Sequence, residues 1–320
     1  MKRRALGRGP ELTEIGLGVA QFGNLYRETT DAEAQGAVDA AWERGIRYFD
    51  TAPHYGLGLS ERRLGAALAG RPRDEYTVST KVGRLIVDNP AGADDWDDQG
   101  FRVRASRRRE WDFSRDGIRR SIDDSLERLG LDRIDIAYLH DPDDHWAEAS
   151  TAGIDALIEL RDQGVVGAIG AGMNQAAMLA EFLRRCDVDV MMVAGRYTLL
   201  DRSADEELLP LALERGVGIV AAGVYNSGLL SSPTVPDDAK LDYAPAPAEV
   251  IAEARRVAAI CEQHGATLPD AAVQFALRHP AVVSVVLGTR TPAQAHSGVD
   301  RYSVPLGDDL WAAIDERGTR

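Results

Sequence analysis

Residues 49–61 read FDTAPHYGLGLSE and connect a short apolar strand to a helix through a loop closed by glycines. We expect the strand over residues 46–49 and the helix over about residues 60–69. Asp50 therefore stands at the carboxyl end of the strand, and Tyr55 lies in the loop that follows. A strand, a loop with polar side chains and a helix form one β-then-α unit, and this unit sets the pattern for the rest of the chain.

The same unit recurs along the whole chain, and its strands are nearly continuous apolar runs. Such runs are typical of parallel strands that are buried on both faces. Because the units follow one another without a long linker, we expect a single (β/α)8 barrel of the α/β class over residues 1–320, rather than a doubly wound sheet. Strands are expected at residues 15–19, 46–49, 76–80, 134–139, 165–169, 188–193, 217–222 and 281–287.

Capping residues mark where two of the helices begin or end. Thr30 and Glu33 form a capping-box pattern before the first helix. Ser114 has the position of an N-cap for a helix that Gly130 ends. Further helices are expected at about residues 152–162, 204–214, 248–264 and 309–316, with others after residues 174, 269 and 291.

The acidic composition disfavours a nucleic-acid partner, since 37 basic and 51 acidic residues give a formal net charge of −14. One basic cluster, Arg102, Arg104 and Arg107–Arg109, is expected to be a solvated loop rather than a phosphate grip. The two cysteines, Cys186 and Cys261, do not suggest a disulfide framework. No apolar run has membrane-spanning length and no signal-peptide pattern is present, so we expect a cytoplasmic protein.

Four chemically active side chains gather at the expected strand ends. Lys81 and His140 each follow a strand directly, as Asp50 does, so all three belong at the carboxyl face of a barrel. Tyr55 lies just beyond Asp50, and its phenol, with a pKa near ~10, is a poor acid or base at neutral pH unless an ammonium lowers that pKa. The acids after His140 lie on one loop and no second group has metal-ligand spacing, so we expect no metal site.

This pattern, Asp-Thr-Ala-x-x-Tyr-Gly followed by Ser60-Glu61, Lys81 and His140, resembles the aldo-keto reductase family with its Asp-Tyr-Lys-His tetrad. The resemblance extends over nearly the whole chain. Residues 169–175 and 226–228 are most similar to the bacterial branch of D-threo-aldose and L-fucose 1-dehydrogenases. The resemblance implies an enzyme that transfers a hydride between a nicotinamide, from NAD or NADP, and a sugar or aldehyde.

The resemblance also implies a role for each of the four side chains. Tyr55 is the general acid–base, and Lys81 lowers its pKa. Asp50 holds Lys81 charged, and His140 orients the substrate oxygen. The implied reaction is oxidation of an aldose at C1 to a lactone. Alternatives within the family are a pyridoxal 4-dehydrogenase, a general aldehyde or ketone reductase and a non-catalytic cofactor-sensing subunit; an isomerase or lyase with a Schiff base at Lys81 is an alternative from another class.

Cofactor contacts are expected from three segments. Asn174 matches the family's asparagine for the nicotinamide carboxamide, although it could equally cap the next helix. The loop at residues 223–247 is expected on the cofactor side, where backbone amides can cradle a pyrophosphate. Barrels also bind phosphate after strand eight, at a helix N-terminus. The residues expected to contact the cofactor are Asn174, Gly223, Tyr225, Ser227, Gly228, Gly288, Thr289, Arg290 and Gln294.

Two positions favour NAD over NADP. NADP-preferring members of the family carry a lysine and an arginine for the 2′-phosphate, and the matching positions here are Gly288 and Gln294. The loss of both cations removes charge-assisted contacts to that phosphate, although Arg290 could still reach it. Gln294 could also be only structural, because it completes a capping box with Thr291.

Residues 82–113 form the longest stretch without helix or strand periodicity. We expect it to be an irregular loop on the active-site side, because loops of this length in compact domains are usually functional or disordered. Trp96 and Trp111 in this stretch could stack on a sugar face or anchor the loop.

Overall fold

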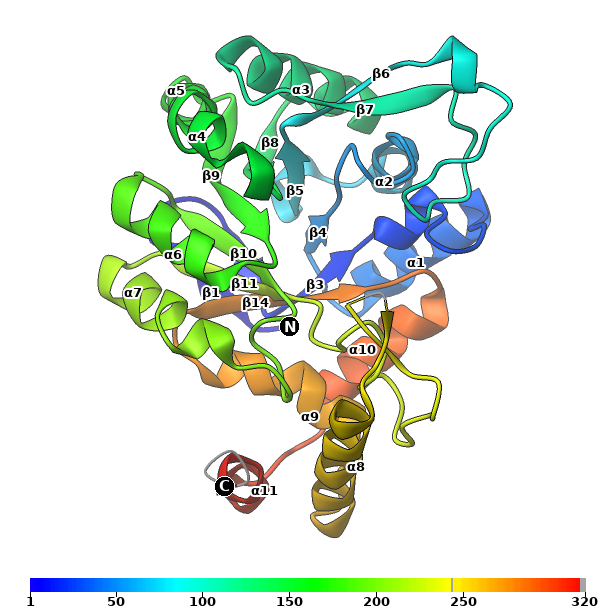
Figure 1. The fold of residues 1–320 in the computed structure, drawn as a ribbon, viewed down its shortest axis with the longest axis vertical. Coiled ribbons are helices and arrows are strands. Elements are labelled where there is room, and N and C mark those ends of the chain that lie inside the picture. The colour runs from blue at the N-terminus through cyan, green and yellow to red at the C-terminus, as the bar shows by residue number, and fades with distance from the viewer. Residues whose placement is uncertain (243, 317–320) are drawn as a thin grey trace.

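Eight parallel strands close into a barrel in the computed structural model, which describes residues 1–242 and 244–316. Figure 1 looks onto this barrel, with helices arranged around it. The expected (β/α)8 fold is therefore confirmed. In order around the barrel, the strands are β3 (Ile15–Gly18), β4 (Tyr48–Asp50), β5 (Thr77–Val82), β8 (Ile134–His140), β9 (Val166–Met173), β10 (Val190–Ala194), β11 (Gly218–Ala222) and β14 (Val282–Gly288), which pairs again with β3.

Helices follow the strands, and the expected capping residues define their ends. Thr30 and Glu33 form the expected capping box, and the Ser114 hydroxyl accepts a hydrogen bond from the backbone N–H of Gly117. Gly130 ends its helix in the left-handed conformation. The helices are α1 (Asp31–Glu43), α2 (Leu59–Leu68), α3 (Arg115–Leu129), α4 (Trp146–Glu148), α5 (Ile154–Asp162), α6 (Ala176–Arg185), α7 (Leu208–Arg215), α8 (Ala248–Gln263), α9 (Leu268–Phe275), α10 (Pro292–Ser303) and α11 (Asp308–Glu316), with a π-helical turn at Ala149–Gly153.

An N-terminal hairpin that the sequence did not predict lies against the amino end of the barrel. Its strands β1 (Arg3–Ala5) and β2 (Glu11–Thr13) pair antiparallel. Leu6 and Leu12 of the hairpin are buried in the same cluster as inward side chains of the barrel strands. At the turn, a side chain on Gly9 would place its Cβ 2.8 Å from the Cβ of Ala168, so the close contact with the barrel requires glycine.

Strand β9 is longer than expected because its glycines are strand residues and not a strand end. Gly170 pairs with Tyr138, and Gly172 pairs with His140. A Cβ on Gly170 would lie only 1.6 Å from the carbonyl oxygen of Val190, so the neighbouring backbone excludes any side chain there.

The expectation that residues 82–113 are irregular is wrong. This stretch contains an antiparallel ribbon of β6 (Arg84–Asp88) and β7 (Arg107–Trp111), with a long connection between the two strands. Figure 1 shows the ribbon beside α3 at the rim of the barrel. The sequence of β7, Arg-Arg-Arg-Glu-Trp, has no apolar alternation, because most of its side chains are exposed, and this removes the usual strand signal.

In the described part of the loop at residues 223–247, the strands are a short antiparallel pair, β12 (Lys240–Leu241) with β13 (Ala244–Pro245). In the described part of the chain, no helix has the length and apolar character needed to cross a membrane.

Candidate active site

The four expected side chains meet at the carboxyl end of the barrel. The Lys81 ammonium donates hydrogen bonds to Asp50 Oδ2 at 2.8 Å, to the carbonyl oxygen of Thr51 at 2.9 Å and to Tyr55 Oη at 3.2 Å. Lys81 and Asp50 are each only 3% exposed. All three donors of the ammonium are therefore used inside the protein, and one of them is directed at the phenol.

Asp50 is also held by a hydrogen bond from the neighbouring strand β5. Strand register places it beside Ser79, whose hydroxyl donates to Asp50 Oδ1 at 2.7 Å. The Ser79 hydroxyl also lies 3.0 Å from that of Tyr48 inside the barrel. Both oxygens of the Asp50 carboxylate thus have a partner, which fixes its orientation toward Lys81.

Ser60 and Glu61, which belong to the motif, support the site without reaching it. The Ser60 hydroxyl donates to the carbonyl oxygen of Val19, and Glu61 is fully buried. Glu61 accepts from Thr80 at 2.7 Å and pairs with Arg128 at 2.5 Å. These contacts fasten the start of α2 to the strand that carries Lys81.

Burial and charge act in opposite directions on the pKa of Tyr55. Burial raises the pKa of the Tyr55 phenol, and the nearby Lys81 ammonium lowers it, with a net rise. The expectation that Lys81 acts to lower this pKa is right in direction, but the desolvation that outweighs it was not foreseen. Burial lowers the pKa of Lys81, but the attraction and hydrogen bonds of Asp50 and Tyr55 together outweigh burial, so the pKa is raised and Lys81 is charged.

His140 is a neutral imidazole beside the phenol. It is 5% exposed, and its ring centre lies 5.9 Å from that of Tyr55 in an edge-on arrangement. Burial and the charge of Arg84 lower the pKa of His140 well below its usual value. Its Nδ1 is buried and has no hydrogen-bond partner among the described residues.

Arg84, which lies beside the tetrad, was not among the expected site residues. Arg84, at the start of β6, forms a 2.6 Å ion pair with Asp141, which follows His140 directly. Its other terminal nitrogen lies 3.3 Å from Nδ1 of His54. Burial and the charges of Arg84 and Arg109 lower the pKa of His54 to about 2, so His54 is neutral as well.

The ribbon of residues 84–111 brings Phe101 and Arg109 over the site. Phe101 is 3% exposed, with its ring centre 5.3 Å from His54 and 6.1 Å from Tyr55. Arg109 donates to the carbonyl oxygen of His54 at 2.8 Å and forms a 2.5 Å ion pair with Asp97. Arg109 is thus an exception to the expected solvated basic cluster, of which Arg102, Arg104, Arg107 and Arg108 are exposed.

The two tryptophans of the ribbon are both partly exposed. Trp96 is 49% exposed and lies beneath the Arg104 guanidinium, 4.2 Å from its ring centre. Trp111 stacks on Phe113 and has the Arg84 guanidinium 4.3 Å from its ring centre. Of the two, only Trp111 contacts a side chain that borders the tetrad.

The expected pyrophosphate loop follows β11, next to the strand end that carries Gly288. Gly223, Ser227 and Gly228 are exposed, and the Tyr225 hydroxyl accepts a hydrogen bond from Arg301 at 2.8 Å. Asn226 was not among the expected contacts. It is 3% exposed, and both polar atoms of its amide are buried without a partner in the described structure. An unsatisfied amide in this loop is suited to a phosphate or ribose oxygen, so the loop fits a dinucleotide.

Asn174 is exposed immediately after β9. The alternative that it caps the next helix is wrong, because Gln175 occupies the N-cap position of α6 and makes no capping hydrogen bond with its side chain. The side chain of Asn174 is therefore not used by the helix, which keeps it available for the expected carboxamide contact.

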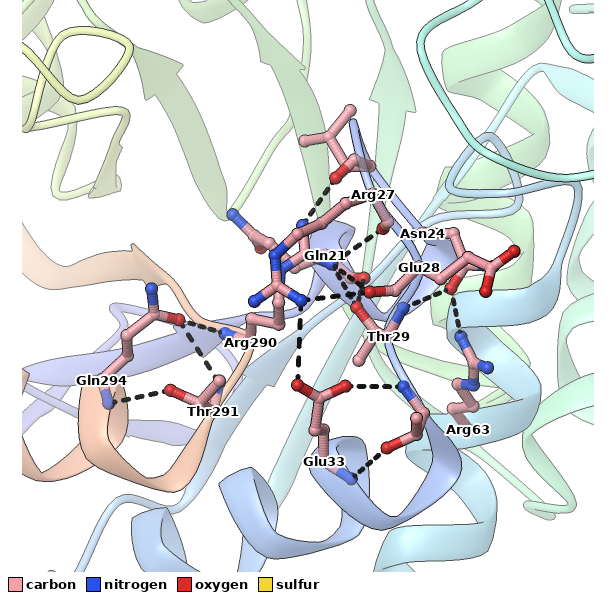
Figure 2. Close-up of polar contacts among 12 residues, drawn as sticks. Gln21, Asn24, Arg27, Glu28, Thr29, Glu33, Arg63, Arg290, Thr291 and Gln294 are labelled. Atoms are coloured by element: carbon pink, nitrogen blue, oxygen red, sulfur yellow. Dashed lines mark hydrogen bonds and ion pairs between the residues drawn. The ribbon is translucent and has the colours of Figure 1, made fainter.

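The Arg290 guanidinium is hydrogen-bonded to the loop after β3 (Figure 2). It is 6% exposed, and its guanidinium donates to the carbonyl oxygens of Leu25 at 2.6 Å and Arg27 at 2.9 Å and to the Thr29 hydroxyl. Thr289 is also buried and donates to the carbonyl oxygen of Leu287. Both terminal nitrogens of Arg290 are thus bound to this loop, which disfavours the expected contact with a 2′-phosphate.

Gln294 has the structural role that its capping box indicates. Its side-chain oxygen accepts from the backbone N–H of Arg290 at 2.8 Å, and it forms the box with Thr291 (Figure 2). Gly288 is exposed, and the amide of Gln21 occupies the space beside it, since a Cβ on Gly288 would lie 2.8 Å from Gln21 Nε2. Gln21 was not predicted, and its Oε1 is buried without a partner in the described ranges.

Comparison with known proteins places this geometry in a family. A model of the aldo/keto reductase family matches residues 14–318. The chain is 47% identical to D-threo-aldose 1-dehydrogenase of a Pseudomonas species, over 98% of this chain and 96% of that protein. It is 40% identical to pyridoxal 4-dehydrogenase of Microbacterium luteolum, over 99% and 97%. An aldo-keto reductase of Bacillus halodurans, solved in its holo form, is similar with a TM-score of 0.77 and 28% identity, over 99% and 96%.

Proposed function

The chain belongs to the aldo-keto reductase family, and from this premise we propose that it oxidises an aldose at C1 to a lactone with NAD as the hydride acceptor. The observation that carries the proposal is the buried Lys81 ammonium, 2.8 Å from Asp50 and 3.2 Å from the Tyr55 hydroxyl. The raised pKa keeps Lys81 protonated. A protonated amine is not a nucleophile, which disfavours the alternative of a Schiff base at Lys81.

Each member of the tetrad then has a role that follows from its contacts. The phenolate form of Tyr55, which the charge of Lys81 stabilises, takes the proton of the C1 hydroxyl and becomes the neutral phenol. Asp50 keeps the ammonium charged and directed at the phenol. His140, which is neutral, offers a hydrogen bond that orients the substrate oxygen.

A bound nicotinamide dinucleotide supplies the ring that accepts the hydride, because no side chain stores one. The backbone amides of residues 223–228 and the amide of Asn226 would hold its pyrophosphate, and Asn174 would hold the carboxamide. Two features of the rim support NAD rather than NADP. Gly288 has no side chain, and both terminal nitrogens of Arg290 bind the loop at residues 25–29, so neither position directs a cation at a 2′-phosphate.

A second candidate is pyridoxal oxidation, which the 40% identity to a pyridoxal 4-dehydrogenase favours. General aldehyde reduction is a third possibility within the family. Both differ from the first in the substrate and not in the roles of the tetrad. The two cysteines, Cys186 and Cys261, are both buried and support the proposal of a reducing compartment, such as the cytoplasm.

The experiment that tests the proposal is a substrate panel read at 340 nm, with NAD and NADP in parallel. The panel contains L-fucose, other aldoses of the D-threo type, pyridoxal and simple aldehydes. We expect the highest kcat/KM for an aldose with NAD. A higher value for pyridoxal would select the second candidate, and no turnover of any substrate would favour the non-catalytic alternative.

A further inference from the structure

The ion pair of Arg84 and Asp141 lies beside the tetrad. Asp141 Oδ2 lies 2.6 Å from the Arg84 guanidinium and 3.6 Å from His140 Nε2. The guanidinium also lies 3.3 Å from His54, the residue before Tyr55. The pair therefore borders both ends of the tetrad, one through His140 and the other through the loop of Tyr55.

The backbone of Asp141 is strained. Its φ of +40° lies in the left-handed region, which is uncommon for residues other than glycine. Its backbone N–H donates to the carbonyl oxygen of Gly172 at 3.0 Å. Strained residues of this kind cluster at functional sites, where the surrounding structure holds them.

The Arg84 guanidinium has a buried N–H donor without a partner in the described part of the chain. Its two terminal nitrogens face Asp141 and His54, the ring of Trp111 covers one face, and Nε is buried without a partner among the described residues. An unpartnered Nε alone is not a site, because Arg73 at the opposite end of the barrel has one too. Arg109, which also lies over the site, has an unpartnered Nε within the described ranges as well. What distinguishes Arg84 is that its carboxylate partner, Asp141, lies 3.6 Å from His140 Nε2.

The charges around the site balance, which indicates an uncharged ligand. Each cation has its own carboxylate: Lys81 pairs with Asp50, Arg84 with Asp141 and Arg109 with Asp97. The lowered pKa values leave both histidines neutral. No cation is in excess for a phosphate or carboxylate of the substrate, whereas single N–H donors remain for the oxygen of a hydroxyl.

We propose that Arg84 is a specificity residue whose Nε–H donates to a hydroxyl oxygen on the carbon next to the reacting carbon of an uncharged substrate. The inference deepens the proposed function and, for aldoses, rests on it. The enzyme then prefers an aldose to its 2-deoxy analogue. A site built to bind a hydroxyl rejects the analogue that lacks it, because the buried donor is left unpaired.

The test compares substrates that differ only in this hydroxyl. In oxidation the pair is an aldose and its 2-deoxy analogue, and in reduction it is lactaldehyde and propanal. Arg84→Lys keeps the ion pair with Asp141 and removes the Nε–H from its place. A second variant, Arg84→Gln with Asp141→Asn, removes both charges at once and so leaves no buried carboxylate unpaired.

Arg73 provides a matched control. It forms a 2.7 Å ion pair with Asp135 at the amino end of the barrel, with side chains 15% and 14% exposed, against 12% and 39% for Arg84 and Asp141. Arg73→Lys therefore repeats the same chemical change away from the reacting groups. The melting temperature of each variant shows how much stability each change removes.

We expect Arg84→Lys to lower kcat/KM for the hydroxylated member of each pair by ~10- to 100-fold, the scale of one hydrogen bond to a charged group, and to leave the deoxy member within about twofold. Arg73→Lys should change neither ratio. An equal loss for both members, or no loss, would overturn the proposal. If only the aldehyde pair turns over and shows the Arg84-dependent preference, the aldose assignment fails and the role of Arg84 stands. Turnover of neither pair would overturn both.

Discussion

At the amino end of the barrel, the carboxylate of Asp189 is fully buried, pairs with Arg161 and accepts a hydrogen bond from the backbone N–H of Ile169. At the carboxyl end, the carboxylate of Asp50 is just as buried and pairs with Lys81. The contacts of Asp189 end on backbone and arginine, and they join two strands. The ammonium of Lys81 instead has a third partner whose proton can move, so the same kind of ion pair serves stability at one end and chemistry at the other.

Unused polar atoms show the same contrast. In the described ranges, buried side-chain atoms without partners concentrate at the carboxyl end: Gln21 Oε1, Arg84 Nε, Arg109 Nε, His140 Nδ1 and both amide atoms of Asn226. Such atoms are costly in a finished protein interior and are useful where a ligand completes them. Most of these atoms therefore lie at the carboxyl end, where a ligand could complete them, although Arg73 Nε at the amino end is unpartnered among the described residues as well.

The largest expected effect sharpens the contrast at the carboxyl end. Tyr55→Phe removes the only proton-transfer group that Lys81 contacts, so kcat should fall by ~10²- to 10⁴-fold, the scale of general acid–base catalysis. Steady-state kinetics with saturating cofactor measures the fall. The free energy of unfolding should stay close to that of the parent, and an unchanged kcat would show that the proton moves by another route.

The counterpart at the amino end is Asp189→Ala. It leaves the half-buried guanidinium of Arg161 with Asp187 as a remaining partner and removes the acceptor of the buried Ile169 N–H, a loss of about 1–3 kcal/mol. Urea unfolding should show this loss, while kcat measured well below the melting temperature stays within about twofold of the parent. A large fall in kcat with little loss of stability would contradict the conclusion that the ion pair at the amino end serves stability and not chemistry.

The buried histidines at the carboxyl end make the free energy of unfolding depend on pH. The pKa of His54 in the folded protein, about 2, lies far below the value of ~6.5 expected in the unfolded chain. The unfolded state therefore binds more protons, and the contribution of His54 is present above pH ~6.5 and is lost as the pH falls towards 2. The free energy of unfolding should fall by up to about 1.4 kcal/mol per pH unit from this residue.

His54→Gln removes this contribution and keeps an acceptor for Arg84. Urea unfolding at pH 6.5, 5.5 and 4.5 should therefore give a shallower decline for this variant than for the parent. His264→Gln, which changes an exposed histidine, serves as the control and should decline like the parent. Parallel curves for all three proteins would mean that His54 is not held neutral by its surroundings.

The smallest expected effect concerns the cofactor side of the same rim. Gly288→Lys adds a cation next to Gln21 Nε2, which is the flexible end of a side chain and can move away from the new Cβ. The Kd for NADPH should fall by up to about tenfold, and the Kd for NADH should change little, because only NADPH carries the additional phosphate. Fluorescence titration measures both, with Gly288→Gln as an uncharged control, and equal shifts for both cofactors would contradict the assignment.

Sequence could predict the tetrad because each of its members follows a strand of the barrel and lies within a short motif. It could not predict Arg84 as a partner of Asp141, since the two are 57 positions apart and meet only through the pairing of β5 with β8. Burial was equally hidden. The rise in the pKa of Tyr55 comes from desolvation, which depends on Phe101 and the rest of the ribbon closing over the phenol.

The elements that were not predicted lack the usual sequence signals of a strand. In β7, the exposed run of arginines lacks the alternation that marks a strand, and in the N-terminal hairpin the strands are only three residues long. For Arg290, the sequence signal was present but suggested the wrong partner. An arginine at the end of a barrel strand suggests a phosphate, and only the three-dimensional contacts show that the backbone of residues 25–29 uses its donors.

That use of Arg290 has a consequence during synthesis on the ribosome. The whole tetrad has been translated by residue 140, but the loop at residues 25–29 gains its guanidinium clamp only after residue 290 emerges. The same loop pairs with the ribbon through the bridge of Leu25 with Phe101. Arg290 therefore holds a loop that contacts the ribbon beside Tyr55. A nascent chain that stops before Arg290 contains all four residues of the tetrad but lacks the guanidinium that binds the loop at residues 25–29.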